Sequence, residues 1–295
     1  MSCRIAFFIF AKVGKVKSVC AILFCMQIGV AYAGPSELII DSSIKPSSSH
    51  RYIRAVHKEI EIYTNDLKKL RYAIVDGMLT TKGYAWVYEG EGDGYILARF
   101  DYRGNTNVVR IEYDESMVQL KYHSALGQYV CQKLVADICY KNEKGYYKYV
   151  KNLRKSIENK LRAHRGTKLV SGESFSEGSL PSVGYEIDVY RNPIPFQHYV
   201  DNLDFLLQNA TGSYGWRLSK EESGRYFATI LHRGYDMKTE LVVRDSSVRV
   251  ELVSASRADC DSCKVEEEEI VGWLIKLRRS IAYDVTLAVR ENADD

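Results

Sequence analysis

The feature that most constrains the fold of this chain is a spaced pattern that occurs in it twice. AWVYEGEGDGYILARFDYRG, residues 85–104, and GWRLSKEESGRYFATILHRG, residues 215–234, both have Trp second, Gly tenth, Ala fourteenth and Arg-Gly at the end. The match continues at the same offset of 130 residues as far as Ser124 and Ser254. A register kept over about forty residues indicates an internal duplication.

Each copy of this core is flanked by segments with helical periodicity. Apolar residues recur at steps of three and four from Ile60 to Ile74, and again from Tyr199 to Ala210. The segments after the cores, which contain LRKSI and LRRSI, have the same spacing. Within each core, apolar and polar residues alternate between turn-forming residues, which predicts strands. We therefore expect an α+β fold of two tandem αββββα repeats, each an antiparallel four-stranded meander with both flanking helices on one face.

Composition divides the chain into five segments. Residues 1–33 are predicted to be a signal peptide, and residues 34–54 a flexible lead-in. Residues 55–163 form the first repeat and residues 196–290 the second. Residues 164–195, which are rich in Gly, Ser and Pro and lack sustained periodicity, are predicted to be a linker.

The predicted signal peptide has the three usual parts. Four basic residues and no acidic residue occur in residues 1–33, an apolar stretch follows the last of them, and the segment ends Ala31-Tyr32-Ala33. The apolar stretch is shorter than the roughly 20 residues of a spanning helix, so we expect no transmembrane segment in the mature chain. An uncleaved membrane anchor and lipid attachment at Cys25 are the alternatives.

Cleavage after Ala33 would also remove the excess of positive charge. Loss of four basic residues from 41 leaves 37 basic side chains against 38 acidic ones. Nucleic-acid binding needs a concentrated basic surface, and a nearly neutral chain gives no case for it.

The predicted export changes the interpretation of the cysteines. Cys131, Cys139, Cys260 and Cys263 remain after cleavage, and an even number in an oxidising compartment indicates disulfides. Three pairings are possible. We expect Cys131–Cys139 and Cys260–Cys263, because each pair lies within the strand-to-helix loop of one repeat. No metal site and no cofactor is expected, although four thiolates would also suit zinc in a reducing compartment.

The sequence CDSC at 260–263 leaves one enzymatic alternative open. A pair of cysteines with this spacing at a helix start is typical of thiol–disulfide exchange. The acidic residues Glu266 to Glu269 follow it, however, and negative charge disfavours a thiolate. The six histidines are scattered, and none has an obvious nucleophilic partner, so no other catalytic motif is evident.

Four residues are candidate contacts for a partner. Arg103 and Arg233 end equivalent strands and are expected to pair with a carboxylate or cap carbonyls within their own domain, and contact with an anionic group on a partner is the functional alternative. Tyr146 and Tyr147 crowd a predicted helix start. An exposed tyrosine pair would suit a protein or glycan contact, and the alternative is that both are packing residues.

The order of Trp, Ala twelve residues later, Arg, an alternating strand ending in Ser and a terminal amphipathic helix resembles small exported bacterial proteins and lipoproteins of unknown function. The resemblance covers each half without leader and linker. It implies an exported location and an αββββα architecture, and it implies no chemistry. The His that such proteins often carry near the start of the last helix is missing, since Tyr147 and Val271 lie there.

We therefore expect a periplasmic or secreted, non-enzymatic binding or accessory protein of the bacterial cell envelope. Its partner would be a protein or an envelope component. A thiol–disulfide oxidoreductase using Cys260 and Cys263 is the alternative from another class. An envelope inhibitor or immunity protein is a further alternative, which the sequence does not separate from other binding proteins.

Overall fold

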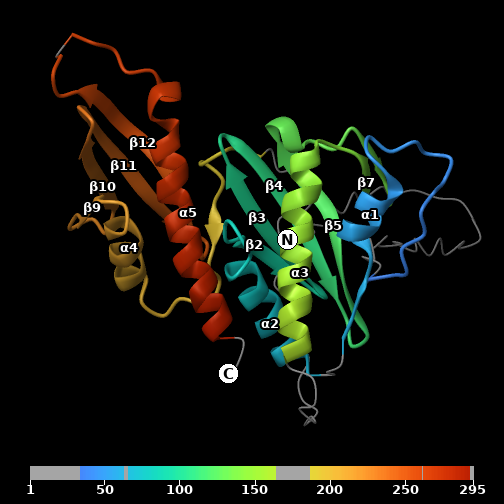
Figure 1. Ribbon diagram of the computed structural model, residues 1–295. Helices are drawn as coiled ribbons and strands as arrows, with labels where there is room; N and C mark the ends of the chain where they lie inside the picture. Colours follow the sequence, from blue (N-terminus) through green and yellow to red (C-terminus); the bar gives the residue numbers. More distant parts are fainter. Residues whose placement is uncertain (1–33, 63–65, 164–186, 261, 293–295) are drawn as a thin grey trace, which may run out of the picture. The chain divides into compact units, whose positions relative to one another are not determined.

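The computed structural model describes residues 34–62, 66–163, 187–260 and 262–292 (Figure 1). All of them belong to one compact unit, Gly34–Asp295. The predicted signal peptide, residues 1–33, lies outside the described residues. Below, the first half means residues 34–163 and the second half residues 187–292.

The first half folds around a five-stranded antiparallel sheet of order β1-β5-β4-β3-β2. Its strands are β1 (Ile60–Glu61), β2 (Val87–Gly92), β3 (Tyr95–Tyr102), β4 (Asn105–Tyr113) and β5 (Met117–Leu126). The other elements are α1 (His50–His57), α2 (Leu67–Leu79), the 3-10 turn η1 (Gly127–Tyr129), the hairpin β6 (Lys133–Val135) and β7 (Ile138–Lys141), and α3 (Lys144–Ala163).

The second half contains a second five-stranded antiparallel sheet of order β8-β12-β11-β10-β9. Its strands are β8 (Ile194–Pro195), β9 (Arg217–Lys220), β10 (Tyr226–His232), β11 (Tyr235–Arg244) and β12 (Ser247–Arg257). Its helices are α4 (Leu203–Gly212) and α5 (Glu267–Glu291). Both α3 and α5 start at the upper end of Figure 1 and run downward.

The helices begin where side chains satisfy their first backbone N–H groups. The Asp66 carboxylate accepts a hydrogen bond from the Lys69 N–H at the start of α2, and Asn202 does the same for Phe205 at the start of α4. Glu266 and Glu269 form a reciprocal capping box at the start of α5. These caps fix where each helix leaves its loop.

The helix layer of the first half is tightly packed. A Cβ atom added at Gly77 of α2 would lie 2.8 Å from the Ile157 Cα of α3, closer than real contacts allow. Gly77 therefore lets the two helices approach each other. Trp86, 1% exposed, and Trp216, 3% exposed, are buried in the core.

The structure corrects two expectations about the elements. Each sheet has five strands instead of the expected four, because β1 adds to the first sheet and β8 to the second. The helix expected from Ile60 begins at Leu67, because Ile60 pairs with Val118 across the sheet edge. The apolar spacing from Ile60 onward fits a helical face, but in the structure Ile60 belongs to β1, which pairs with β5.

The predicted lead-in and linker also contain ordered contacts. Residues 34–54 include the start of α1, and three apolar residues before it pack on a small cluster of Ile53, Ile138 and Tyr140. The last part of the predicted linker contains β8, which pairs with β12. Residues 164–186 of that linker lie outside the described residues.

Candidate functional site

The two Arg-Gly pairs form the tips of the β3–β4 and β10–β11 hairpins. The flanking residues pair directly, so Arg and Gly alone connect the strands. The backbone φ is 50° at Arg103, 72° at Gly104, 52° at Arg233 and 80° at Gly234. Positive φ at both central positions is typical of a type I′ turn, where a non-Gly residue is uncommon. Both arginine side chains are exposed, and within the described residues neither is in an ion pair.

Three tyrosine rings from different parts of the first half meet beside Arg103. Tyr84 precedes β2, Tyr102 ends β3 and Tyr149 lies near the start of α3. The ring centroids of Tyr84 and Tyr102 are 5.5 Å apart, and those of Tyr102 and Tyr149 are 5.8 Å apart. Buried Phe100 contacts all three rings. Tyr84, Tyr102 and Tyr149, named the tyrosine cluster below, keep part of their surface in solvent, and Tyr84 is 44% exposed.

Each ring of the tyrosine cluster has one cation close to it. The distances from Cζ or Nζ to the ring centroid are 5.1 Å for Arg103 and Tyr102, 6.0 Å for Lys148 and Tyr149, and 5.8 Å for Arg279 and Tyr84. Arg279 reaches the cluster from α5 of the second half. No ion pair within the described part of the chain involves any of these three cations. Their charge is therefore not neutralised by a neighbouring carboxylate.

The Tyr149 hydroxyl stays protonated at neutral pH. Desolvation raises the pKa of Tyr149, the nearby Tyr102 and Tyr84 raise it further, and Arg103 lowers it. A protonated phenol donates and accepts hydrogen bonds. The surface thus combines apolar ring faces, hydroxyl groups and positive charge.

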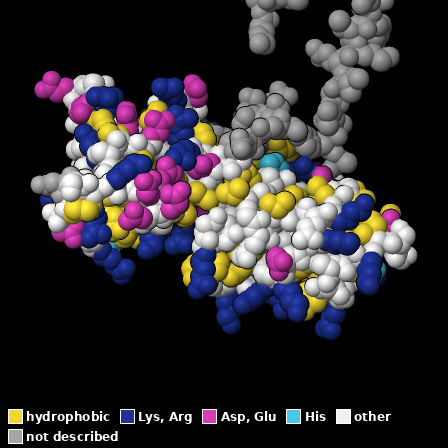
Figure 2. All heavy atoms as spheres, turned by 90° about the horizontal axis from the view of Figure 1, so that it is seen from above, with side chains coloured by type: hydrophobic (Ala, Val, Ile, Leu, Met, Phe, Trp, Pro, Cys, Tyr) yellow, Lys and Arg dark blue, Asp and Glu magenta, His cyan; other side chains and the backbone are white. Residues whose placement is uncertain are grey.

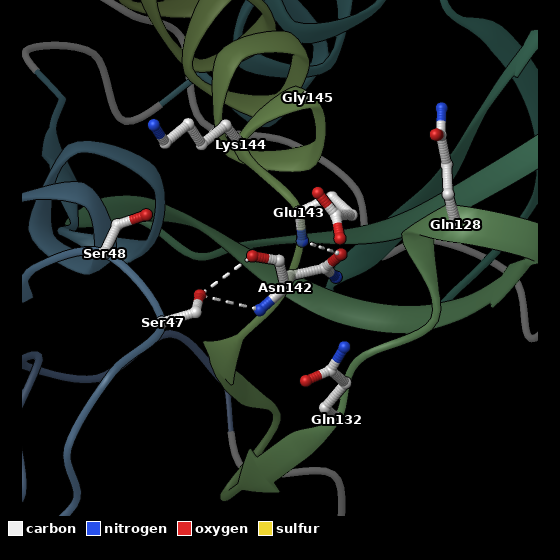
Figure 3. A pocket seen from close by; sticks show the side chains of 8 residues that line it. All are labelled: Ser47, Ser48, Gln128, Gln132, Asn142, Glu143, Lys144 and Gly145. Atoms are coloured by element: carbon white, nitrogen blue, oxygen red, sulfur yellow. Dashed lines mark hydrogen bonds between the residues drawn. The ribbon is translucent and has the colours of Figure 1, made fainter.

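The structure has a polar pocket of about 530 Å³ (Figure 3), and Gly145 in its wall lies close to the tyrosine cluster. Its lining residues are Ser47, Ser48, Gln128, Gln132, Asn142, Glu143, Lys144 and Gly145. A Cβ at Gly145 would lie 3.4 Å from the Tyr129 ring and 3.8 Å from the Tyr149 ring, so the pocket wall and the cluster are adjacent.

Buried Asn142 fixes the geometry of this pocket. Its Nδ2 donates to the Tyr129 carbonyl at 2.8 Å, and its Oδ1 accepts from the Glu143 N–H at 2.8 Å. The Ser47 hydroxyl donates to the Asn142 carbonyl at 2.8 Å and accepts from its N–H at 3.2 Å. Figure 3 shows Gln128, Gln132 and Lys144 on separate segments around this fixed centre.

Two buried polar side chains near the cluster have no hydrogen-bond partner among the described residues. They are Asn107, through both amide atoms, and Tyr146, through its hydroxyl. Asn107 lies opposite Phe100 in the β3–β4 ladder, and Tyr146 is one turn before Tyr149 on α3. Such groups cost about 1–3 kcal/mol each and are rare in native cores. Asn107 and Tyr146 therefore lower the folding stability of the first half beneath this surface.

The structure places Tyr146 and Tyr147 inside the protein rather than on its surface. Both are buried, Tyr146 packs against Tyr122 at 6.0 Å, and Tyr147 packs against Tyr52 at 6.0 Å between ring centroids. They are packing residues of the amphipathic helix α3, and a partner has no access to them.

Arg233 has a different electrostatic setting from Arg103. The neighbouring Trp273 packs on His232 and Tyr235, but the Tyr235 hydroxyl donates to Glu269 at 2.7 Å. Acidic side chains gather on this part of the second half, at the left of Figure 2, whereas hydrophobic and basic side chains prevail on the first half at the right. The two equivalent arginines therefore do not present equivalent surfaces.

The cysteines form the two expected disulfides, Cys131–Cys139 and Cys260–Cys263. The second disulfide lies about one turn before α5, which begins at Glu267, so Cys263 does not occupy the helix N-terminus that would favour a thiolate. Across the described ranges, no three His, Cys, Asp or Glu side chains are grouped as metal ligands. Nor does any helix in those ranges have the length and apolar character to span a bilayer.

Sequence reasoning identified Arg103 but not the grouping of tyrosines and cations around it. The available signal was the duplicated register, in which Tyr84 aligns with Tyr214 just before the conserved spacing begins. Tyr149 and Arg279 belong to distant helices, and their meeting depends on tertiary packing. No protein-family model, no curated protein and no solved structure matches this chain, so the site is interpreted from its geometry alone.

Proposed function

We propose that the protein is an exported, non-enzymatic binding protein of the bacterial cell envelope, periplasmic or secreted. Its binding surface is the tyrosine cluster with Arg103, Lys148 and Arg279. The observation that carries this proposal is that three partly exposed rings each have a cation without an ion pair, beside an open polar pocket. Exposed rings and unneutralised charge contribute little to folding, and they are the groups that contact partners.

The proposal includes a duplication of an αββββα unit, with short additional strands at the sheet edges. Three observations support it. The Arg-Gly turns have the same backbone conformation in both halves, and the two aligned tryptophans are buried in both. The helix pairs α2–α3 and α4–α5 each pack together in the same chain order. The resemblance to small exported αββββα proteins is part of the same proposal.

The two disulfides support an exported location, because disulfides persist in oxidising compartments. They do not favour the oxidoreductase. Cys263 is followed by acidic residues and by a helix that starts too late to stabilise its thiolate. We expect no reduction of insulin disulfides by the purified protein, and a turnover lost on Cys260→Ser would favour the enzyme instead.

The proposed surface is tested by retention of the purified protein on washed envelopes from cells that lack it. Arg103→Gln combined with Lys148→Gln removes two exposed cations without opening the core. We expect retention to fall about tenfold, as loss of about 1.4 kcal/mol implies, with an unchanged melting temperature. Arg217→Gln, which removes an exposed charge from β9, is the matched control. Equal retention of the double variant and the wild type would refute the assignment of this surface.

A further inference from the structure

We infer that the ligand of this surface is an anionic glycan, a sugar polymer that bears carboxylate, sulfate or phosphate groups. The inference rests on the proposed function and makes it specific. Three independent features of the site carry it: the arrangement of the rings, the distribution of the cations and the chemistry of the pocket.

The rings of the tyrosine cluster suit successive sugar units. Adjacent rings are tilted by 51° and 49°, so they present separate faces rather than one continuous stack. The C–H groups of a pyranose face pack on the electron-rich face of an aromatic ring. The centroid separations of 5.5 and 5.8 Å are similar to the length of one sugar unit along a chain. A linear glycan can thus place neighbouring units on neighbouring rings.

The cations extend beyond the cluster along one face of α3. Lys144, Lys148, Lys151 and Lys155 follow one another at steps of four, three and four, which places them on one side of the helix. None of them is in an ion pair within the described residues. A row of positive charge suits a polymer with repeated anionic groups better than it suits a single small anion.

The pocket beside the cluster adds groups that match sugar hydroxyls. Hydroxyl and amide side chains line it together with Lys144 and the carboxylate of Glu143, and no apolar side chain does. Gln128 and Gln132 each offer donors and an acceptor, as Ser48 does, and each sugar hydroxyl needs both. An acidic protein would instead be expected to bury apolar anchors in such a depression. Single-stranded nucleic acid would also use the rings and cations, so it is included among the comparison polymers below.

The experiment measures binding of the purified, disulfide-intact protein to defined polymers by isothermal titration calorimetry. The anionic glycans are polygalacturonate, which carries carboxylates, and dextran sulfate. Neutral dextran, poly-L-glutamate and an oligo-dT strand are the comparison polymers. We expect at least one anionic glycan to bind about tenfold or more tightly than each comparison polymer, and which of the two binds better identifies the anionic group.

Two variants separate glycan recognition from simple charge attraction. Arg103→Gln should weaken glycan binding and reduce its dependence on salt concentration, because one cation is lost. Gln128→Ala changes no charge and, in the pocket, should weaken binding of the glycan severalfold without altering its salt dependence. Arg217→Gln should change neither. An electrostatic surface without sugar recognition would be unaffected by Gln128→Ala, and this result would overturn the inference.

The outcomes also distinguish this inference from the proposed function. If poly-L-glutamate or oligo-dT binds as tightly as the glycans, or if no polymer binds, the glycan assignment is wrong. Retention on envelopes that depends on Arg103 and Lys148 would still support the binding surface in that case. If that retention is insensitive to both residues, the proposed function fails together with the inference.

Discussion

His57 at the end of α1 makes the stability of the first half sensitive to acid. The side chain is fully buried, its Nδ1–H donates to the Leu120 carbonyl of β5 at 2.8 Å, and its Nε2 accepts from the Cys139 N–H of β7 at 3.3 Å. One neutral imidazole therefore joins α1, β5 and the disulfide hairpin. Burial lowers the pKa of His57 to about 4, the hydrogen bond to Leu120 raises it slightly, and Lys121 lowers it further.

The sign and size of the effect follow from this pKa. An unfolded His binds a proton below about pH 6.5, whereas folded His57 binds one only below about pH 4. Between these values the unfolded state holds more protons, so stability is lost as the pH falls. A difference of about 2.5 pKa units corresponds to about 3 kcal/mol, at about 1.4 kcal/mol per pH unit. The loss is complete near pH 4.

Urea unfolding of the disulfide-intact protein at several pH values from 7.5 to 4 measures this loss. His57→Gln keeps a neutral polar group at the site, so we expect lower stability at pH 7 but a much flatter pH profile. The pKa of His123 is also lowered, by desolvation and by Arg110, but its side chain is exposed, so His123→Gln should leave the slope nearly unchanged. If His57→Gln retains the wild-type slope between pH 6.5 and 4, another group is responsible and the reasoning is wrong.

Three further predictions concern the buried ion pairs of Glu89 with Arg99 and Arg278, which join the two halves, the tryptophans of the core, and the export signal. Glu89→Ala leaves the buried Arg278 without a carboxylate, while Arg99 keeps Asp101, and it should cost about 3–5 kcal/mol in urea unfolding; a cost below about 1 kcal/mol would mean that water replaces the carboxylate. Trp86→Ala and Trp216→Ala should each cost about 3–5 kcal/mol, and a nearly neutral result at either would contradict its burial in the core. The exported protein should have the intact mass of a chain that begins at Gly34, and a mass that retains residues 1–33 would remove the export argument.

The parts of the fold that depend on local pattern were predictable from the sequence. The α+β class, the antiparallel strands and the helices around Leu70 and Leu277 follow from periodicities of two and about 3.6 residues. Both disulfides followed from loop position. The short strands β1 and β8 did not, because two residues carry no period, and Ile60 also fitted a helical face.

The surface residues were harder to predict for a physical reason. Whether a tyrosine is exposed depends on what packs over it, and the sequence spacing of Tyr146, Tyr147 and Tyr149 is equally compatible with either state. In the structure the first two lie on the buried face of α3 and the third lies beside the hairpin tip. The Arg279 contact requires α5 to lie against the first half, which no local signal encodes.

A network of buried charged side chains joins the first half to the second. Arg99 and Arg278 are both 0% exposed, and both donate to the Glu89 carboxylate. Arg99 also donates to the Asp101 carboxylate of its own half, and to Asn192 Oδ1 and the Asp188 carbonyl in the segment before β8. The first half thus supplies two buried carboxylates and one arginine, and Arg278 of the second half supplies the second positive charge.

The edge strands β2 and β9 of the two sheets also differ, because β2 contacts helix α5 of the other half and β9 is largely exposed. On the edge strand β2, the Tyr88 N–H donates to the Thr286 hydroxyl of α5 at 2.8 Å, so part of that edge is covered. The corresponding edge strand of the second sheet, β9, is short and exposes Arg217 and Lys220, which is the usual protection of an open edge. Under the proposed duplication, Thr229 stands where the first copy has Arg99. Under that proposal the two copies differ at the positions where the first half contacts the second. Helix α5 supplies Arg278 and Thr286 to this contact, and it also supplies Arg279 to the tyrosine cluster. The proposed binding surface therefore depends on the docking of both halves, even though its rings belong to one of them.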